Sequence, residues 1–101
     1  MAHTIIHHNG AFNVYSSIVD APIFEHALTR EQLTEWYKDE YGNSGLSSLP
    51  DRIARAESKG SSSRLSPSLK SDVSGNHAGP DGTELPIDAF IAQFLTLPTA
   101  V

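Results

Sequence analysis

The first quarter of the chain alternates apolar and polar residues in the pattern of a β-hairpin. Residues 4–7 and 12–19 are rich in β-branched and aromatic side chains, which favour strands. The two runs flank Asn9-Gly10, the dipeptide most typical of a tight hairpin turn. After Pro22, which would interrupt a central strand, residues 23–26 predict a further short strand at the edge of the sheet. The side chains expected on one face of the second strand are Phe12, Val14 and Ile18.

Helical spacing of apolar residues begins after this sheet. Thr29 and Gln32 have the arrangement of a capping box, in which each side chain satisfies a backbone N–H group of the other residue. They predict the start of a helix over about 30–41, and the Gly42–Gly45 segment predicts its end. The apolar stripe of this helix is made of Leu33, Trp36, Tyr37 and Tyr41.

A second helix is expected over about 49–59. Ser48 or Leu49 would open it, with Pro50 in the first turn, where proline is tolerated. Gly60 is typical of the residue that ends a helix. Its buried side is expected to consist of Leu46, Leu49, Ile53 and Ala56.

Residues 60–83 differ in composition from the segments on either side. Serine, glycine, proline and asparagine dominate them, which predicts a long loop, and a loop of this length is usually functional or disordered. Within it, the dense turn residues of 75–82 are either a tight connection or, through Asn76 and the glycines, a surface that a ligand approaches closely. A last helix is expected over about 86–95. Its apolar face is made of Ile87, Phe90, Ile91, Phe94 and Leu95.

The order of these elements predicts the fold class. Strands come first and helices follow, which favours an α+β fold over a parallel α/β fold. We therefore expect one small domain over residues 1–101, with an N-terminal antiparallel hairpin or small sheet, two or three short helices and a long Ser/Gly-rich loop.

Composition narrows the class of protein further. The chain has no cysteine and a net charge of −5, so disulfides and thiolate metal sites are excluded and a general binder of long nucleic acid is not expected. A chain of 101 residues buries a modest core, which makes a homo-oligomer a common route to stability. The apolar runs are too short for a membrane span, and no signal peptide is visible, so a cytoplasmic protein is expected.

The residues offer little support for catalysis. The five histidines lack the spacing of a metal site, and surface or hairpin positions explain them adequately. No nucleophile elbow, phosphate-binding loop or dinucleotide fingerprint is present. We therefore expect a non-enzymatic protein without a cofactor or metal.

One basic segment stands out on this acidic chain. Residues 52–64 hold four of the seven basic residues, and three of them recur at i, i+3 and i+7, which places them on one helix face. The candidate ligand-binding residues are Arg52, Arg55, Lys59, Ser62, Arg64 and Asn76. Arginine suits bidentate phosphate contacts, but a helix C-terminus repels anions. The segment is thus either half of an anion site, completed by 75–82 or by another subunit, or simply a basic helix end before a linker.

Four stretches of the sequence carry a family resemblance: YSSIVD, ALTREQLTEW, LPDRIARAESKGSSS and GNHAGPDGTELPIDAFIAQF. Together they resemble small phage anti-defence proteins, best matched by the Thoeris anti-defence 1 family. The resemblance implies an oligomeric α+β protein that binds a nucleotide-derived immune signal, a cyclic ADP-ribose isomer or cyclic oligonucleotide, without cleaving it. The polar segment after Arg64 lacks further arginines, so subunits would have to share the phosphate site.

A second resemblance points to a different class of function. The order of the hairpin, the Glu-Gln-Leu–Trp helix, the Gly-Leu link and another helix is similar to a small type I-F anti-CRISPR protein. Such a protein inhibits a host complex through its surface. Residues 20–40, with six acids against two bases and hence a net charge of −4, would be the interacting face.

Overall fold

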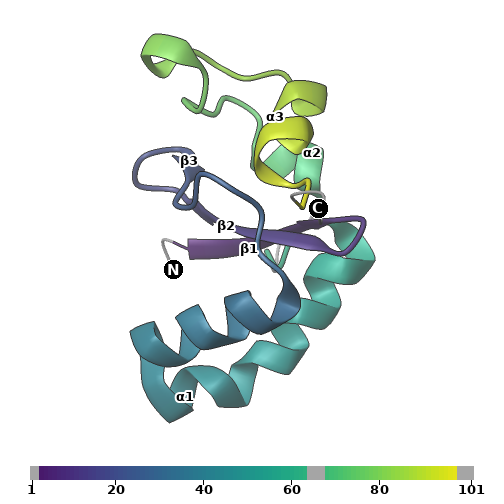
Figure 1. Ribbon diagram of the computed structural model, residues 1–101. Helices are drawn as coiled ribbons and strands as arrows, with labels where there is room; N and C mark the ends of the chain where they lie inside the picture. The colour runs from purple at the N-terminus through teal and green to yellow at the C-terminus, as the bar shows by residue number, and fades with distance from the viewer. Residues whose placement is uncertain (1–2, 64–67, 98–101) are drawn as a thin grey trace.

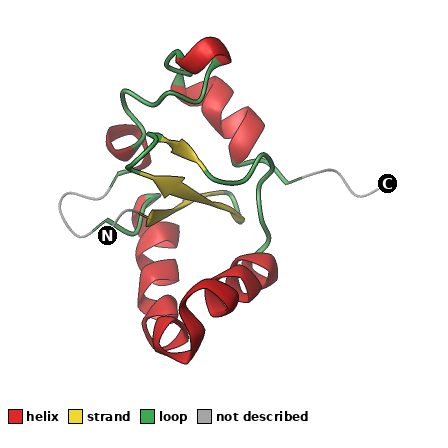
Figure 2. Cartoon of the chain, turned by 90° about the vertical axis from the view of Figure 1, so that its left-hand side faces the viewer, coloured by secondary structure: helices red, strands yellow, loops and turns green. Residues whose placement is uncertain are grey.

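The computed structural model describes residues 3–63 and 68–97. A three-stranded antiparallel sheet lies between two helical layers, with α1 on one face and α2 and α3 on the other (Figures 1 and 2). This arrangement confirms the predicted α+β class. The elements are β1 His3–His8, β2 Ala11–Ser16, β3 Ala21–Pro22, α1 Arg30–Lys59, α2 Leu69–Asp72, the 3-10 turn η1 Pro80–Gly82, and α3 Ile87–Phe94.

The predicted hairpin is confirmed. Strands β1 and β2 pair in antiparallel register, and the two turn residues have φ values of 47° and 81°, as a type I′ turn requires. Strand β2, however, ends at Ser16, three residues earlier than predicted, and Ile18 is 78% exposed.

The third strand was predicted too late in the chain. It covers Ala21–Pro22, which pairs with the end of β2, and residues 23–26 are not a strand. Asp20 adopts a left-handed φ of 54° and turns the chain back sooner than Pro22 alone would suggest. A proline is tolerated here because β3 is an edge strand and needs no donor on its outer side.

A segment far along the chain covers the other edge of the sheet. After α1, Ser61 forms an antiparallel bridge with Ile6 on β1. The backbone N–H of His7 donates to Gly60 O at 3.0 Å, and the N–H of Ser62 donates to Ile5 O at 2.9 Å. An uncovered edge would offer unpaired backbone groups to other chains, and these hydrogen bonds remove that opportunity along the middle of β1.

Helix α1 consists of two limbs that double back on each other (Figure 1). The bend is at Gly42, whose φ of 66° lies in the left-handed region. At the start of the first limb, Thr29 and Gln32 form the predicted capping box, and Gly60 caps the second limb with a φ of 87°.

The start of the second limb differs from the prediction. Residues 43–48 are already helical, so Pro50 lies inside the limb and not in its first turn. Gly42 alone absorbs the change of direction, which leaves no need for a four-residue link. The hydroxyls of Ser47 and Ser48 donate to carbonyls three residues earlier and so do not interrupt the helix.

The two faces of the sheet carry two separate cores. On one face, α1 packs against the sheet, and on the other, α3 and the 69–85 region pack against it. The first core comprises Ile5, Phe12, Val14, Leu33, Tyr37, Leu49, Ile53 and Ala56. The second comprises Ile6, Tyr15, Val73, Phe90, Phe94 and Leu95. The predicted apolar stripes of all three helices supply these cores. Strands β1 and β2 contribute to both cores, since alternate residues of a strand face opposite sides of the sheet.

The predicted loop over 60–83 contains more regular structure than its composition indicated. Helix α2 and the turn η1 both lie within it, and Val73 is buried in the second core. No helix in the described ranges is both long enough and apolar enough to span a bilayer.

Candidate anion-binding site

Two arginines one helical turn apart form the centre of the candidate site. Arg52 and Arg55 lie on the second limb of α1, and both are partly buried. The Nε of Arg55 donates a hydrogen bond to the carbonyl of Ser62 at 3.1 Å. Ser62 is itself fixed against β1, so this bond aims the Arg55 side chain along the segment that leaves the helix.

Both guanidinium groups keep hydrogen-bonding capacity that the described residues do not use. Arg52 Nε and Arg55 Nη2 are buried and have no acceptor. A buried donor without an acceptor costs about 1–3 kcal/mol, and more when it is charged. An anion placed here would remove that cost.

The remaining basic candidates have other positions. Lys59 is exposed in the last turn of α1, where a positive charge stabilises the helix by interacting with its dipole. Arg64 lies outside the described residues. The structure therefore assembles the predicted basic face from Arg52 and Arg55, with Lys59 at its exposed end.

The Ser62 side chain is committed to the sheet. Its Oγ accepts a hydrogen bond from the Ile5 N–H at 3.0 Å, while its own N–H donates to Ile5 O. The hydroxyl is buried. Ser62 therefore contributes to the site by positioning Arg55 through its carbonyl.

Asn76 lies in the other helical layer. It is buried, and its Nδ2 donates to the carbonyls of Val73 and Leu85 at 2.8 and 3.0 Å. Its Oδ1 accepts from the N–H groups of Ala78 and Leu85, both at 3.0 Å. These four bonds close the 73–85 loop. Since Val73 packs on the sheet face opposite α1, the loop does not complete the arginine site within one subunit.

A cluster of aromatic rings, absent from the candidates that the sequence provided, lies between the sheet and α1. Trp36 is at its centre, with the rings of its neighbours 5.5 to 6.0 Å away between centroids. The cluster consists of His3, Phe24, Trp36, Tyr37 and Tyr41. Helical spacing identified three of these residues as an apolar stripe. His3 and Phe24 come from distant segments, and no local pattern links them to the helix.

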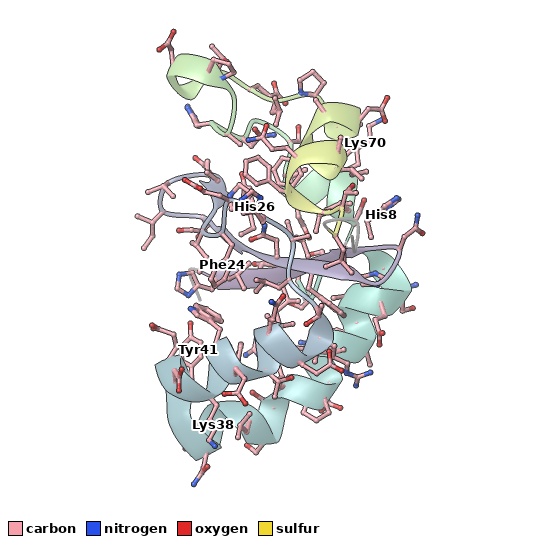
Figure 3. The ribbon with its side chains drawn as sticks, viewed as in Figure 1. His8, Phe24, His26, Lys38, Tyr41 and Lys70 are labelled. Atoms are coloured by element: carbon pink, nitrogen blue, oxygen red, sulfur yellow. The ribbon has the colours of Figure 1, made fainter. Side chains whose placement is uncertain are left out.

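A hydrogen bond of 2.7 Å joins His3 Nδ1 to the Tyr41 hydroxyl. Figure 3 shows Phe24 beside the sheet and Tyr41 on α1, on the same side of the molecule. Burial raises the pKa of Tyr41, and Tyr37 and Glu40 raise it further, whereas the positive charge of Arg52 lowers it. Arg55 reaches the same edge of the sheet through Ser62, which bonds to Ile5, and His3 is two residues before Ile5 on the same face of β1.

Other features of the surface do not coincide with the arginines. An open hollow of about 440 Å³ lies beside His26, Thr29 and Leu97, and a second one lies between His8 and Leu97. Neither is lined by a lysine or arginine. Among the described residues, no group of three or more histidine, aspartate or glutamate side chains is arranged to hold a metal ion.

His7 gives the hairpin a dependence on pH. Its Nε2 accepts a hydrogen bond from the Gly10 N–H at 3.0 Å, which requires that nitrogen to be unprotonated. Burial lowers the pKa of His7 below its ordinary value of 6.5, and His8 lowers it too, while Glu57 opposes them. In the folded state the neutral ring is therefore favoured.

We expect the free energy of unfolding to fall as the pH drops below about 6.5, because the unfolded chain then takes up a proton that folded His7 resists. In His7→Gln, whose amide oxygen can accept from Gly10, this part of the loss should disappear. Urea unfolding of both proteins between pH 7.5 and pH 5 measures the difference. His8→Gln, at the adjacent position, is the control; a His7→Gln curve parallel to the wild-type curve would contradict the prediction.

The residues and their geometry remain the basis for any functional conclusion about this chain. Its sequence matches no protein-family model and no curated protein, and its structure matches no solved structure.

Proposed function

We propose that this protein binds and sequesters a phosphate-bearing, nucleotide-derived ligand without chemically altering it. The observation that carries the proposal is the pair of arginines on α1, whose buried Arg52 Nε and Arg55 Nη2 have no acceptor in the described part of the chain. A phosphate supplies several acceptor oxygens in a geometry that matches the guanidinium fork. A buried guanidinium N–H group without an acceptor is costly unless a ligand supplies one.

The helix dipole, which argues against an anion at a helix C-terminus, acts mainly on the last turn. Arg55 is four residues and Arg52 seven residues before Lys59, where α1 ends. Most of the unfavourable potential is therefore felt by a ligand near Lys59 and not by one near Arg52. This placement makes Arg52 a better anchor for an anion than its position in the sequence indicated, whereas Arg55, which bonds to Ser62 beyond the helix end, lies closer to the unfavourable potential.

The biological role that we propose is the one that the resemblance of the sequence to small phage anti-defence proteins implies. A protein similar to the Thoeris anti-defence 1 family would bind a cyclic ADP-ribose isomer or a cyclic oligonucleotide and so block a bacterial immune signal in the host cytoplasm. Because the loop that contains Asn76 faces the other layer, we propose that a second subunit completes the phosphate site in a homo-oligomer.

The experiment is a retention assay. The protein is incubated separately with cyclic ADP-ribose isomers and with cyclic dinucleotides, freed of unbound compound and heated, and the released compound is identified by mass spectrometry. We expect at least one intact compound to be retained, and at least about a 100-fold weaker affinity in Arg52→Glu/Arg55→Glu, since losing two charge-assisted contacts costs roughly 3 kcal/mol or more.

Arg30→Glu is the matched control, because it reverses the charge of an exposed arginine on the first limb of α1, whereas Arg52 and Arg55 are partly buried on the second. It should leave retention unchanged. Circular dichroism and size-exclusion chromatography establish that each variant keeps its fold and its assembly. If none of the compounds is retained, or if the double variant retains them as well as the wild type, the proposal fails.

One observation favours a second candidate function, inhibition of a host protein complex. Ile18 and Val19 are 78% and 59% exposed. They lie in the turn that precedes β3, directly before the acidic 20–40 region. Exposed apolar residues of this size often mark a protein contact. Ile18→Asp separates the candidates: it should weaken binding to a partner protein, and leave retention of a nucleotide intact.

A further inference from the structure

The aromatic cluster around Trp36 is only partly used by the core. Tyr37 is buried, but His3, Phe24, Trp36 and Tyr41 are all partly exposed. They pack against the edge of the first core and do not form its centre. This aromatic surface is ordered and partly exposed, and through Ser62 and Ile5 it lies along the same edge of the sheet as Arg55, whose Nη2 has no acceptor among the described residues. Such a surface has the properties needed to stack a planar ring.

The orientation of these rings is fixed before any ligand arrives. The 2.7 Å hydrogen bond between the Tyr41 hydroxyl and His3 Nδ1 ties the end of the first limb of α1 to the start of β1. Trp36 is held edge-on by Phe24, with an angle of 85° between the ring planes, and by Tyr41, at 87°. Rings that are already ordered lose little conformational entropy on binding.

We infer that the rings of Trp36, Tyr41 and His3 form a base-binding subsite, next to the phosphate subsite at Arg52 and Arg55. This inference rests on the proposed function and adds where the ligand's planar heterocyclic base binds and which rings recognise it. A sugar phosphate, an inositol phosphate or a polyphosphate would engage only the arginines. Stacking of one base on protein rings strengthens binding by roughly five- to 150-fold.

The chain contains one tryptophan, and it lies at the centre of this cluster, so its fluorescence reports directly on the subsite. The probes are adenosine 5′-monophosphate and ribose 5-phosphate, which share the sugar phosphate and differ in the base. Their affinities for the wild-type protein are measured by calorimetry, and Trp36 emission is followed in parallel titrations. We expect the adenosine compound to bind at least about fivefold more tightly and to be the one that changes the emission.

Substitutions at Tyr41 separate the ring from the hydroxyl. Tyr41→Leu should bring the affinity for adenosine 5′-monophosphate close to that for ribose 5-phosphate, whereas Tyr41→Phe should keep most of the preference. If Tyr41→Leu does not fold, His3→Leu removes a ring at the start of β1 and should also reduce the preference. His8→Leu, at the other end of β1, is its matched control and should leave the preference unchanged.

The outcomes distinguish this inference from the function on which it rests. Equal affinity for the two compounds, with no change in emission, overturns the base-binding subsite while leaving anion binding at the arginines intact. Binding of neither compound at millimolar concentration also overturns it, and retention of a cyclic nucleotide that depends on Arg52 and Arg55 would still support the proposed function. A preference for the adenosine compound that survives Tyr41→Leu and His3→Leu places the base elsewhere and contradicts the inference.

Discussion

Replacing Asn13 with aspartate is expected to lower the free energy of unfolding by about 3 kcal/mol or more. Asn13 is in the middle of β2 with 0% exposure. Its Nδ2 donates to Phe24 O at 3.1 Å and to Phe94 O at 3.0 Å, and its Oδ1 accepts from the Val14 N–H. An aspartate would turn a carboxylate oxygen toward two carbonyl oxygens and bury a negative charge without a cation.

This loss should depend on pH in a recognisable way. Burial raises the pKa of a carboxyl group, so the introduced aspartate takes up a proton in the folded state at a higher pH than in the unfolded state. The protonated form can donate to one of the two carbonyls. The difference in stability between Asn13→Asp and the wild type should therefore shrink as the pH is lowered, which urea unfolding at pH 7.5 and pH 5 measures.

Gln93→Glu is the matched control for Asn13→Asp. It makes the same change from amide to carboxylate at an exposed position on α3, where we expect an effect within about 0.5 kcal/mol. A loss of stability in Asn13→Asp no larger than that of Gln93→Glu would mean that Asn13 does not join β2 to the end of α3.

Truncating Phe90 to alanine is the second substitution with a large expected effect, about 3–5 kcal/mol. Phe90 has 0% exposure, and its ring centroid lies 6.3 Å from that of Tyr15 on β2 and 5.3 Å from that of Phe94. Its removal leaves a cavity where α3 meets the sheet. Because a domain of this size is stable by roughly 5–15 kcal/mol in total, the variant should be close to unfolding.

Thermal and urea unfolding of Phe90→Ala measure this effect. Ile18→Ala is the control, since Ile18 is a large apolar residue that is 78% exposed, and its truncation should change stability by at most about 0.5 kcal/mol. Similar losses in the two variants would show that the α3 layer contributes little to the fold. Hydrogen exchange would then be expected to be as fast in α3 as in the turn around Ile18.

The parts of the fold that the sequence predicted have strong local signals. Asn9-Gly10 can adopt the positive φ values of a hairpin turn, the Thr29–Gln32 capping box starts α1, and the apolar face over 86–95 marks α3. Each of these depends on residues that are close together in the sequence. The wrong predictions concern places where a single backbone angle decides, namely Asp20 before β3 and Gly42 within α1. Composition does not indicate which of several turn residues will take the unusual conformation.

The candidate site was predictable to a similar extent. Spacing along a helix placed Arg52 and Arg55 on one face, and the structure adds that one buried N–H group of each lacks an acceptor among the described residues. Asn76 looked equally available in the sequence, because nothing local reveals that four backbone groups would surround its amide. The ring cluster was missed for the opposite reason: His3 and Phe24 reach Trp36 only after the sheet has formed on α1.

The pairing of Ser61 and Ser62 with β1 has a consequence for how the chain folds. Ile5 and Ser62 are 57 residues apart in sequence, yet each supplies hydrogen bonds to the other. On the ribosome, β1 emerges before α1, and its outer edge lacks the partner at residues 61–62 until both limbs of α1 have been synthesised. Contacts of such long sequence separation slow folding, and an unpaired strand can associate with other chains in the meantime. The interval between the synthesis of β1 and that of residue 62 is thus the period in which the nascent chain is most vulnerable to misassembly.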